Sequence, residues 1–135
     1  MKRCPFGHTR FETSDPRYDA KQAIHLALTT IMLLLGMKLL LPGSTFASSH
    51  SYRAMERIFF EDTWGYLFLF VGSWGVLGLF VAGPIRKLSV AVLASAHGTL
   101  ALCLWIGNPA GTGPPTYGTI ACLGYYLLYV RLFHR

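Results

Sequence analysis

The chain has 135 residues, enough for one domain, and 53% of them are hydrophobic while only 13% are charged. A soluble domain of this size could not hide so much apolar surface, and its apolar residues fall in long blocks rather than along one face of each helix. The net charge of +6 does not indicate a nucleic-acid partner, because nearly all the basic residues flank these blocks and form no stripe interleaved with aromatic residues.

Residues 1–23 form a polar, basic tail. Its run Thr13-Ser14-Asp15-Pro16 is typical of a helix start, with Ser14 or Asp15 as the N-cap and Pro16 in the first turn. We therefore expect the first helix to begin in the cytoplasm and to continue into the membrane. The simplest interpretation of the tail is a leader that binds lipid headgroups, and the alternative is a docking site for a cytoplasmic partner.

Four apolar blocks follow the tail, each close to the ~20 residues that an α-helix needs to cross ~30 Å of hydrocarbon. They cover residues 24–41, 64–82, 88–106 and 117–133. The first three end at breaks that contain glycine and proline. The sequence therefore predicts an all-α fold, a membrane-embedded four-helix bundle in which residues 1–135 form a single domain, with outer loops at residues 42–63 and 107–116.

The first block could also be mistaken for a secretory signal peptide. A basic leader precedes it, and Thr45-Phe46-Ala47 after it resembles a cleavage site. Both the leader and the apolar stretch are longer than is usual in signal peptides. We therefore expect this block to be a membrane anchor.

The orientation is predicted from the lysines and arginines, which gather on the cytoplasmic side of membrane proteins. They are dense in the tail and in the turn after the second block, and they recur at the C-terminus. The turn and the C-terminus hold Arg86, Lys87, Arg131 and Arg135. The loops on the other side hold only Arg53 and Arg57, which nearby acidic residues offset. The expected location is thus the bacterial inner membrane, with both termini in the cytoplasm.

The first outer loop predicts a short amphipathic helix within residues 49–60. Four of its apolar residues recur at i, i+3, i+6 and i+7, and so share one helical face: Tyr52, Met55, Ile58 and Phe59. The charged residues lie largely on another face: Arg53, Glu56 and Arg57. Such a helix lies along a membrane surface. It serves either as a structural belt or as a surface that recognises another protein.

Small residues in the second and third spans favour close helix packing. Those of the second span are Gly72, Gly75, Gly78 and Ala82, and the third span adds Ala94 and Gly98. The pattern fits packing within one molecule and packing between copies equally well.

One ionisable residue lies at the centre of a predicted span. His97 sits in the third span, with Ser95 and Thr99 nearby. The structural interpretation is a neutral imidazole that bonds to a neighbouring helix, and the functional one is proton handling or the lining of a lumen.

Signs of enzymatic chemistry are missing from the sequence. It has no HExxH, GxSxG or Walker motif, and no paired acidic residues within one predicted span. Cys4 and His8 form a lone Cys-x3-His pair, too few ligands for zinc. We expect a protein that is not an enzyme and has neither a metal nor a cofactor.

Several short motifs together resemble a group of small four-span membrane proteins encoded by tailed bacteriophages. They are Leu41-Pro42-Gly43-Ser44-Thr45-Phe46, Ser51-Tyr52-Arg53-Ala54-Met55, Trp64-Gly65, and Asn108-Pro109 with Gly113 and Tyr117. The resemblance covers most of the chain after Ala20. It implies a location in the host inner membrane and a phage-related role, but no activity.

Three functional hypotheses are consistent with these features. The leading one is a protein that interacts with a host or phage partner in the membrane. The second is a holin-like lysis protein, which would oligomerise through its small-residue faces and permeabilise the membrane. The third is a small channel or transporter subunit that uses His97. Beyond the lipid bilayer, the expected partners are copies of the chain itself or another membrane protein.

Overall fold

A computed structural model describes residues 16–43, 45–48, 50–81 and 83–133. Most of residues 1–23, and the positions of Ala82 and Arg135, lie outside these ranges. Within them the chain forms helices, turns and loops without any strand. The prediction of an all-α fold is thus confirmed for the part of the chain that the structure describes.

Three of the helices are long and apolar enough to cross a membrane. They are the Ala20–Leu40 part of α1 (Pro16–Leu40), α4 (Glu61–Phe80) and α5 (Pro84–Gly107). The last long helix, α6 (Gly113–Phe133), is not among them, although it has 21 residues. Its tyrosines and Arg131 lower its apolar character. The fourth membrane span therefore stays a prediction.

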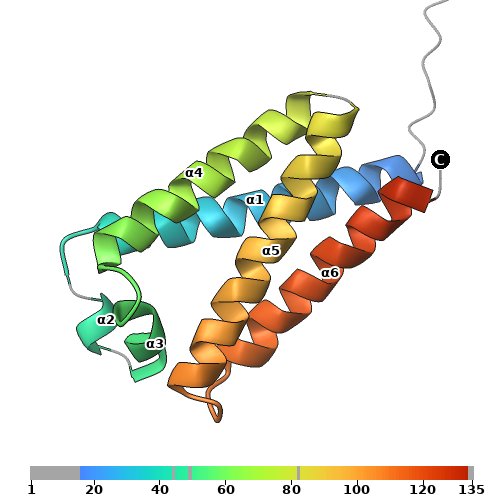
Figure 1. Ribbon diagram of the computed structural model, residues 1–135. Coiled ribbons are helices and arrows are strands. Elements are labelled where there is room, and N and C mark those ends of the chain that lie inside the picture. Colours follow the sequence, from blue (N-terminus) through green and yellow to red (C-terminus); the bar gives the residue numbers. More distant parts are fainter. Residues whose placement is uncertain (1–15, 44, 49, 82, 134–135) are drawn as a thin grey trace, which may run out of the picture.

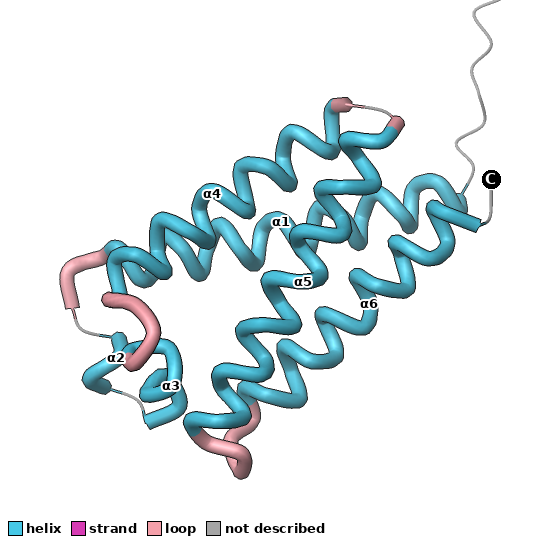
Figure 2. Tube along the Cα trace, viewed as in Figure 1, coloured by secondary structure: helices cyan, strands magenta, loops and turns pink. Residues whose placement is uncertain are grey.

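The long helices pack in two pairs, α1 along α4 and α5 along α6 (Figure 1). A tight turn joins α4 to α5, and Gly83 adopts a φ of 78° there, a conformation that suits glycine. Pro84 then opens α5 at the first helical position. The start of α1 and the end of α6 lie at the same end of the molecule (Figure 2).

Glycines allow α1 and α4 to approach closely. A Cβ atom on Gly36 of α1 would lie 2.8 Å from the backbone nitrogen of Leu69 and 3.0 Å from the carbonyl oxygen of Gly65, both in α4. The backbones meet here without side chains between them, as at small-residue interfaces of membrane helices.

The core lies between the pairs, while apolar side chains also cover the outside. Leu28, Met32 and Leu93 are almost wholly buried. The outer faces of all four long helices nevertheless expose large side chains, namely Leu34, Phe70, Leu102 and Tyr126. Apolar residues on both the inside and the outside are what a helix surrounded by lipid requires.

The segment between α1 and α4 differs from the prediction. Instead of one amphipathic helix it contains α2 (Thr45–Ser48), a 3₁₀ turn at His50–Tyr52 and α3 (Arg53–Glu56). The expected shared face does not form, because Met55 is fully buried whereas Ile58 and Phe59 are 54% and 51% exposed. Tertiary contacts override the helical periodicity here, as the carbonyl of Met55 is used by a tryptophan of α4.

Candidate functional site

The loop segment, defined here as residues 45–60, is anchored to the helices through Trp64. The indole Nε1–H of Trp64 donates a buried hydrogen bond of 2.9 Å to the carbonyl oxygen of Met55. Inside the segment, the rings of Phe46 and Tyr52 stack with their centroids 5.3 Å apart. Trp64, Phe46 and Met55 are all buried. The segment therefore has a core of its own that continues into the helical core.

A carboxylate and an amide hold the segment at two further points. The backbone N–H groups of Thr45 and Phe46 donate to the two carboxylate oxygens of Glu61, at 2.8 and 3.2 Å. The side-chain amide of Asn108 donates to the hydroxyl oxygen of Ser51 at 3.4 Å. The contacts tie residues 45–56 to the start of α4 and to the end of α5, so both helix pairs hold the segment.

Tyr52 lies inside this anchored region. Burial raises the pKa of the Tyr52 hydroxyl above its ordinary value, and the negative charge of Glu61 raises the pKa further. The phenol is thus neutral under physiological conditions. Of the residues predicted to face a partner, Tyr52 and Met55 instead serve the interior of the segment.

The remaining predicted residues are exposed. Arg53, Glu56 and Arg57 all point their side chains to the surface, as does Phe59. They adjoin Ile58 and Phe60, and Phe60 is 86% exposed. The segment therefore exposes both charged and apolar side chains, while hydrogen bonds with Trp64, Glu61 and Asn108 fix its backbone.

His97 is fully buried in α5, on the side facing the core. Its Nδ1–H donates to the carbonyl oxygen of Leu93 at 2.8 Å, so the neutral ring carries its lone pair on Nε2. Among the described residues none donates to that Nε2 atom. The ring of Tyr117 lies near, at a centroid distance of 6.4 Å. The Nε2 atom of His97 can therefore still accept one hydrogen bond.

Ser95 and Thr99 do not share the environment of His97. Both are exposed on α5. The Thr99 hydroxyl donates to the carbonyl oxygen of Ser95 at 3.0 Å, and the Ser95 hydroxyl lies 3.3 Å from that of Tyr125. Ser95 and Thr99 thus share an exposed face of α5, while His97 lies on the buried face.

The glycines of the second span pack within one molecule. Gly72 faces Leu33 of α1, Gly75 faces Thr29 and Leu93, and Gly78 faces Ser89 and His25. All three glycines are buried.

The small residues of α5 differ from one another. Ala94 is fully buried and lies against Gly124 of α6. A Cβ atom on Gly98, in contrast, would meet nothing closer than 3.9 Å.

A polar network crosses the basic end, our term for the end of the helices that carries Lys21, Arg86, Lys87 and Arg131. Its centre is His25 of α1, which is fully buried. Arg131 of α6 places Nη1 at 3.4 Å from His25 Nδ1, and Ser89 of α5 places Oγ at 3.2 Å from His25 Nε2. Arginine can only donate, so Nδ1 accepts and Nε2–H donates to Ser89. A neutral His25 thereby joins three helices.

Arg86 closes the end of α4 in the same region. Its Nε–H lies 3.2 Å from the carbonyl oxygens of Gly78 and Val81, and its Nη2 donates to that of Leu79 at 3.3 Å. The last carbonyls of a helix have no partner within it, so a guanidinium satisfies them well. The sequence predicted only that Arg86 marks the cytoplasmic side of the membrane. Its capping role and the His25 network were both missed, because they depend on pairs of residues far apart in the chain.

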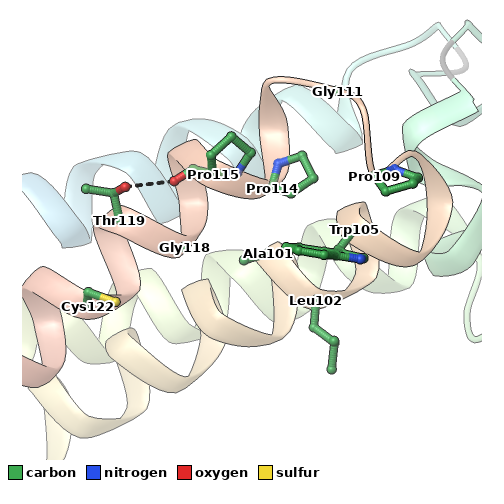
Figure 3. A pocket seen from close by; sticks show the side chains of 10 residues that line it. All are labelled: Ala101, Leu102, Trp105, Pro109, Gly111, Pro114, Pro115, Gly118, Thr119 and Cys122. Carbon is green, nitrogen blue, oxygen red and sulfur yellow. Dashed lines mark hydrogen bonds between the residues drawn. The ribbon is translucent and has the colours of Figure 1, made fainter.

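A wide groove of about 760 Å³ lies between the end of α5 and the start of α6 (Figure 3). Trp105 and Leu102 line it from α5, and Pro115 and Gly118 from α6. Among the described residues, no charged one lines it. Elsewhere in the described ranges, no three His, Cys, Asp or Glu side chains gather closely enough to hold a metal ion.

Comparisons with models of protein families, with curated proteins and with solved structures gave no match. The resemblance to phage-encoded membrane proteins therefore stays a prediction.

Proposed function

We propose that the chain is a small inner-membrane protein with four spans that acts without catalysis, by binding another membrane protein of a bacterial host or of a phage. The loop segment is its recognition surface. The observation that carries this proposal is a backbone anchored by Trp64, Glu61 and Asn108 that still presents exposed charged and apolar side chains. A surface whose backbone is already ordered before the partner arrives loses little conformational entropy on binding.

The composition of this surface favours a protein partner at the membrane boundary. Ile58, Phe59 and Phe60 supply apolar anchors, and Arg53 and Arg57 supply charge beside them. Aromatic and arginine side chains dominate the binding energy of protein interfaces.

The four-span arrangement is supported by the pairing of α6 with α5. The two helices pack along each other and are joined by a short connection, so a chain that crosses in α5 returns in α6. An even number of spans would place the basic start of α1 and Arg131 on the same side, as the distribution of basic residues predicts.

The two other hypotheses receive unequal support. The glycines of α4 are already occupied inside the molecule, so they give no support to a holin-like oligomer built through that face. The channel hypothesis is favoured by one observation, the buried His97 Nε2 without a donor. Measurements of membrane potential during expression distinguish the two from the interaction hypothesis, which predicts an unchanged potential.

A photo-crosslinking experiment tests the recognition surface. A photoreactive phenylalanine analogue replaces Phe60 in one variant and Phe80 in its matched control. These residues are 86% and 83% exposed and lie at opposite ends of α4. We expect a discrete protein adduct from position 60 and none of the same mass from position 80.

Charge reversal then shows whether the adduct depends on the surface. Arg57→Glu should abolish the adduct at position 60, while Lys87→Glu at the other end should leave it intact. Adducts with lipid alone, or the same protein adducts at both positions, would refute the proposed recognition surface.

A further inference from the structure

A second groove, of about 480 Å³, opens between α1 and α6 at the basic end. Its apolar lining includes Ile24, Leu127 and Val130, and its polar lining includes Lys21, Tyr126 and Tyr129. Lys21 lies one helical turn before Ile24 in α1. The charged group therefore sits at the outer end of the groove, and the apolar wall continues towards the middle of the helices.

Positive charge is concentrated beside this groove. The Arg131 guanidinium is held at the α1–α6 crossing, where its Nη2 donates to the carbonyl oxygen of Lys21 at 3.4 Å. Lys21 lines the groove, and Arg131 lies beside it with its guanidinium on His25 and on the Lys21 carbonyl oxygen. Among residues with described side chains, the acidic ones, Glu56, Glu61 and Asp62, all belong to the loop segment or the start of α4 at the opposite end.

We propose that this groove binds one anionic phospholipid of the surrounding membrane. Its phosphate lies against the Lys21 ammonium, where the nearby charge of Arg131 adds to the attraction, and an acyl chain follows Ile24, Leu127 and Val130. Basic pockets between membrane helices bind anionic headgroups in this way. A free phosphate ion would use the charge but not the apolar wall, and a zwitterionic lipid would use the wall but gain less from the charge.

The groove between α5 and α6 serves as an internal reference. It is larger, but none of the described residues that line it is charged (Figure 3). Lipid chains in that groove should therefore be retained without regard to their headgroup. The proposed lipid site requires only that the helices lie in a membrane, and it is independent of the partner proposed for the loop segment.

Native mass spectrometry tests the proposal with the full chain. The protein is placed in nanodiscs that contain phosphatidylcholine and phosphatidylglycerol in equal amounts, and the lipids that stay bound after release into detergent are counted. We expect one phosphatidylglycerol molecule to be retained in preference to phosphatidylcholine. Equal retention of the two lipids by the unaltered protein would overturn the proposal without any variant.

Two variants locate the site and a third serves as the matched control. Lys21→Gln should lower phosphatidylglycerol retention roughly fivefold, whereas Lys21→Arg should preserve it. Arg57→Gln, which changes an exposed arginine of the loop segment that lines neither groove, should have no effect. Circular dichroism confirms that each variant is folded. If Lys21→Gln and Arg57→Gln lose phosphatidylglycerol equally, the lipid is attracted by overall positive charge rather than by this groove, and the proposed site is overturned.

Discussion

The two ends of the molecule satisfy their buried polar groups in different ways. At the basic end, side chains from separate helices bond directly to one another, with His25 between Ser89 and Arg131. At the other end, backbone groups of a folded connection bond to side chains of the helices, as Met55 does with Trp64. The first arrangement ties the helices together, and the second fixes a loop on top of them.

This difference distinguishes a structural end from the recognition surface that we propose for the loop segment. The hydrogen bonds of the basic end point into the core. Substitutions that remove them should therefore lower the free energy of unfolding. The contacts of the loop segment fix its backbone while Arg53, Arg57 and Phe60 stay exposed. Changes to those exposed residues should therefore alter binding and leave stability nearly unchanged.

The largest effect is expected where α4 meets the network. In Gly78→Ala, the new Cβ would overlap the Ser89 hydroxyl and separate α4 from α5. Overpacking of this kind costs about 3 kcal/mol of unfolding free energy. Gly98→Ala is the control, since its Cβ meets nothing within 3.9 Å. Chemical unfolding in detergent measures both variants, and equal stabilities would contradict the close packing of these helices.

The two buried histidines provide the next test. His25→Leu removes bonds to two other helices and leaves Ser89 and Arg131 without that partner, so we expect a loss of about 2 kcal/mol. His97→Leu removes the Nδ1–H bond to the Leu93 carbonyl together with a buried Nε2 that has no donor among the described residues, so the two changes offset each other and we expect a loss below about 1 kcal/mol. Thermal unfolding of the two variants gives the comparison. A greater loss for His97→Leu would show that its Nε2 binds a group in the membrane, as the channel hypothesis requires.

A smaller effect is expected for the anchor of the loop segment. Trp64→Phe keeps most of the buried ring but removes the bond to Met55, at a cost of about 1 kcal/mol. Hydrogen exchange in residues 45–60 should become faster while exchange in α5 is unchanged. Trp105→Phe, at a 64% exposed position, is the control. Faster exchange throughout the molecule would contradict a locally anchored segment.

The smallest expected effect is the titration of Tyr52. Its pKa is raised by burial and by Glu61, so the folded state favours the neutral phenol. The resulting stabilisation is complete below the ordinary tyrosine pKa of about 10 and is lost as the pH rises through the higher folded value. Ultraviolet absorbance measures phenolate formation, and Tyr52→Phe identifies the signal. Ionisation of Tyr52 at or below pH ~10 would contradict its burial beside Glu61.

The share of the fold and of the candidate site that the sequence predicts differs between the two ends of the molecule. The apolar blocks with their glycine and proline breaks predicted the long helices, because helix length and hydropathy are local properties. Helical periodicity failed at Met55 and Ile58: Met55 is buried and accepts a hydrogen bond from Trp64, whereas Ile58 is exposed. The partners of His25 lie 64 and 106 positions away in the sequence, and no local pattern indicates such pairs.

We propose that the two ends of the molecule face opposite sides of a bilayer. Sided labelling tests it in a chain whose own cysteines, Cys4, Cys103 and Cys122, are replaced by serine. Arg57→Cys and Lys87→Cys then place one thiol at each end, and a membrane-impermeant maleimide is added to intact cells. We predict labelling of Arg57→Cys in intact cells, and of Lys87→Cys only after the membrane is permeabilised. Labelling of both variants in intact cells would contradict the proposed orientation and the separation of the two ends by a membrane.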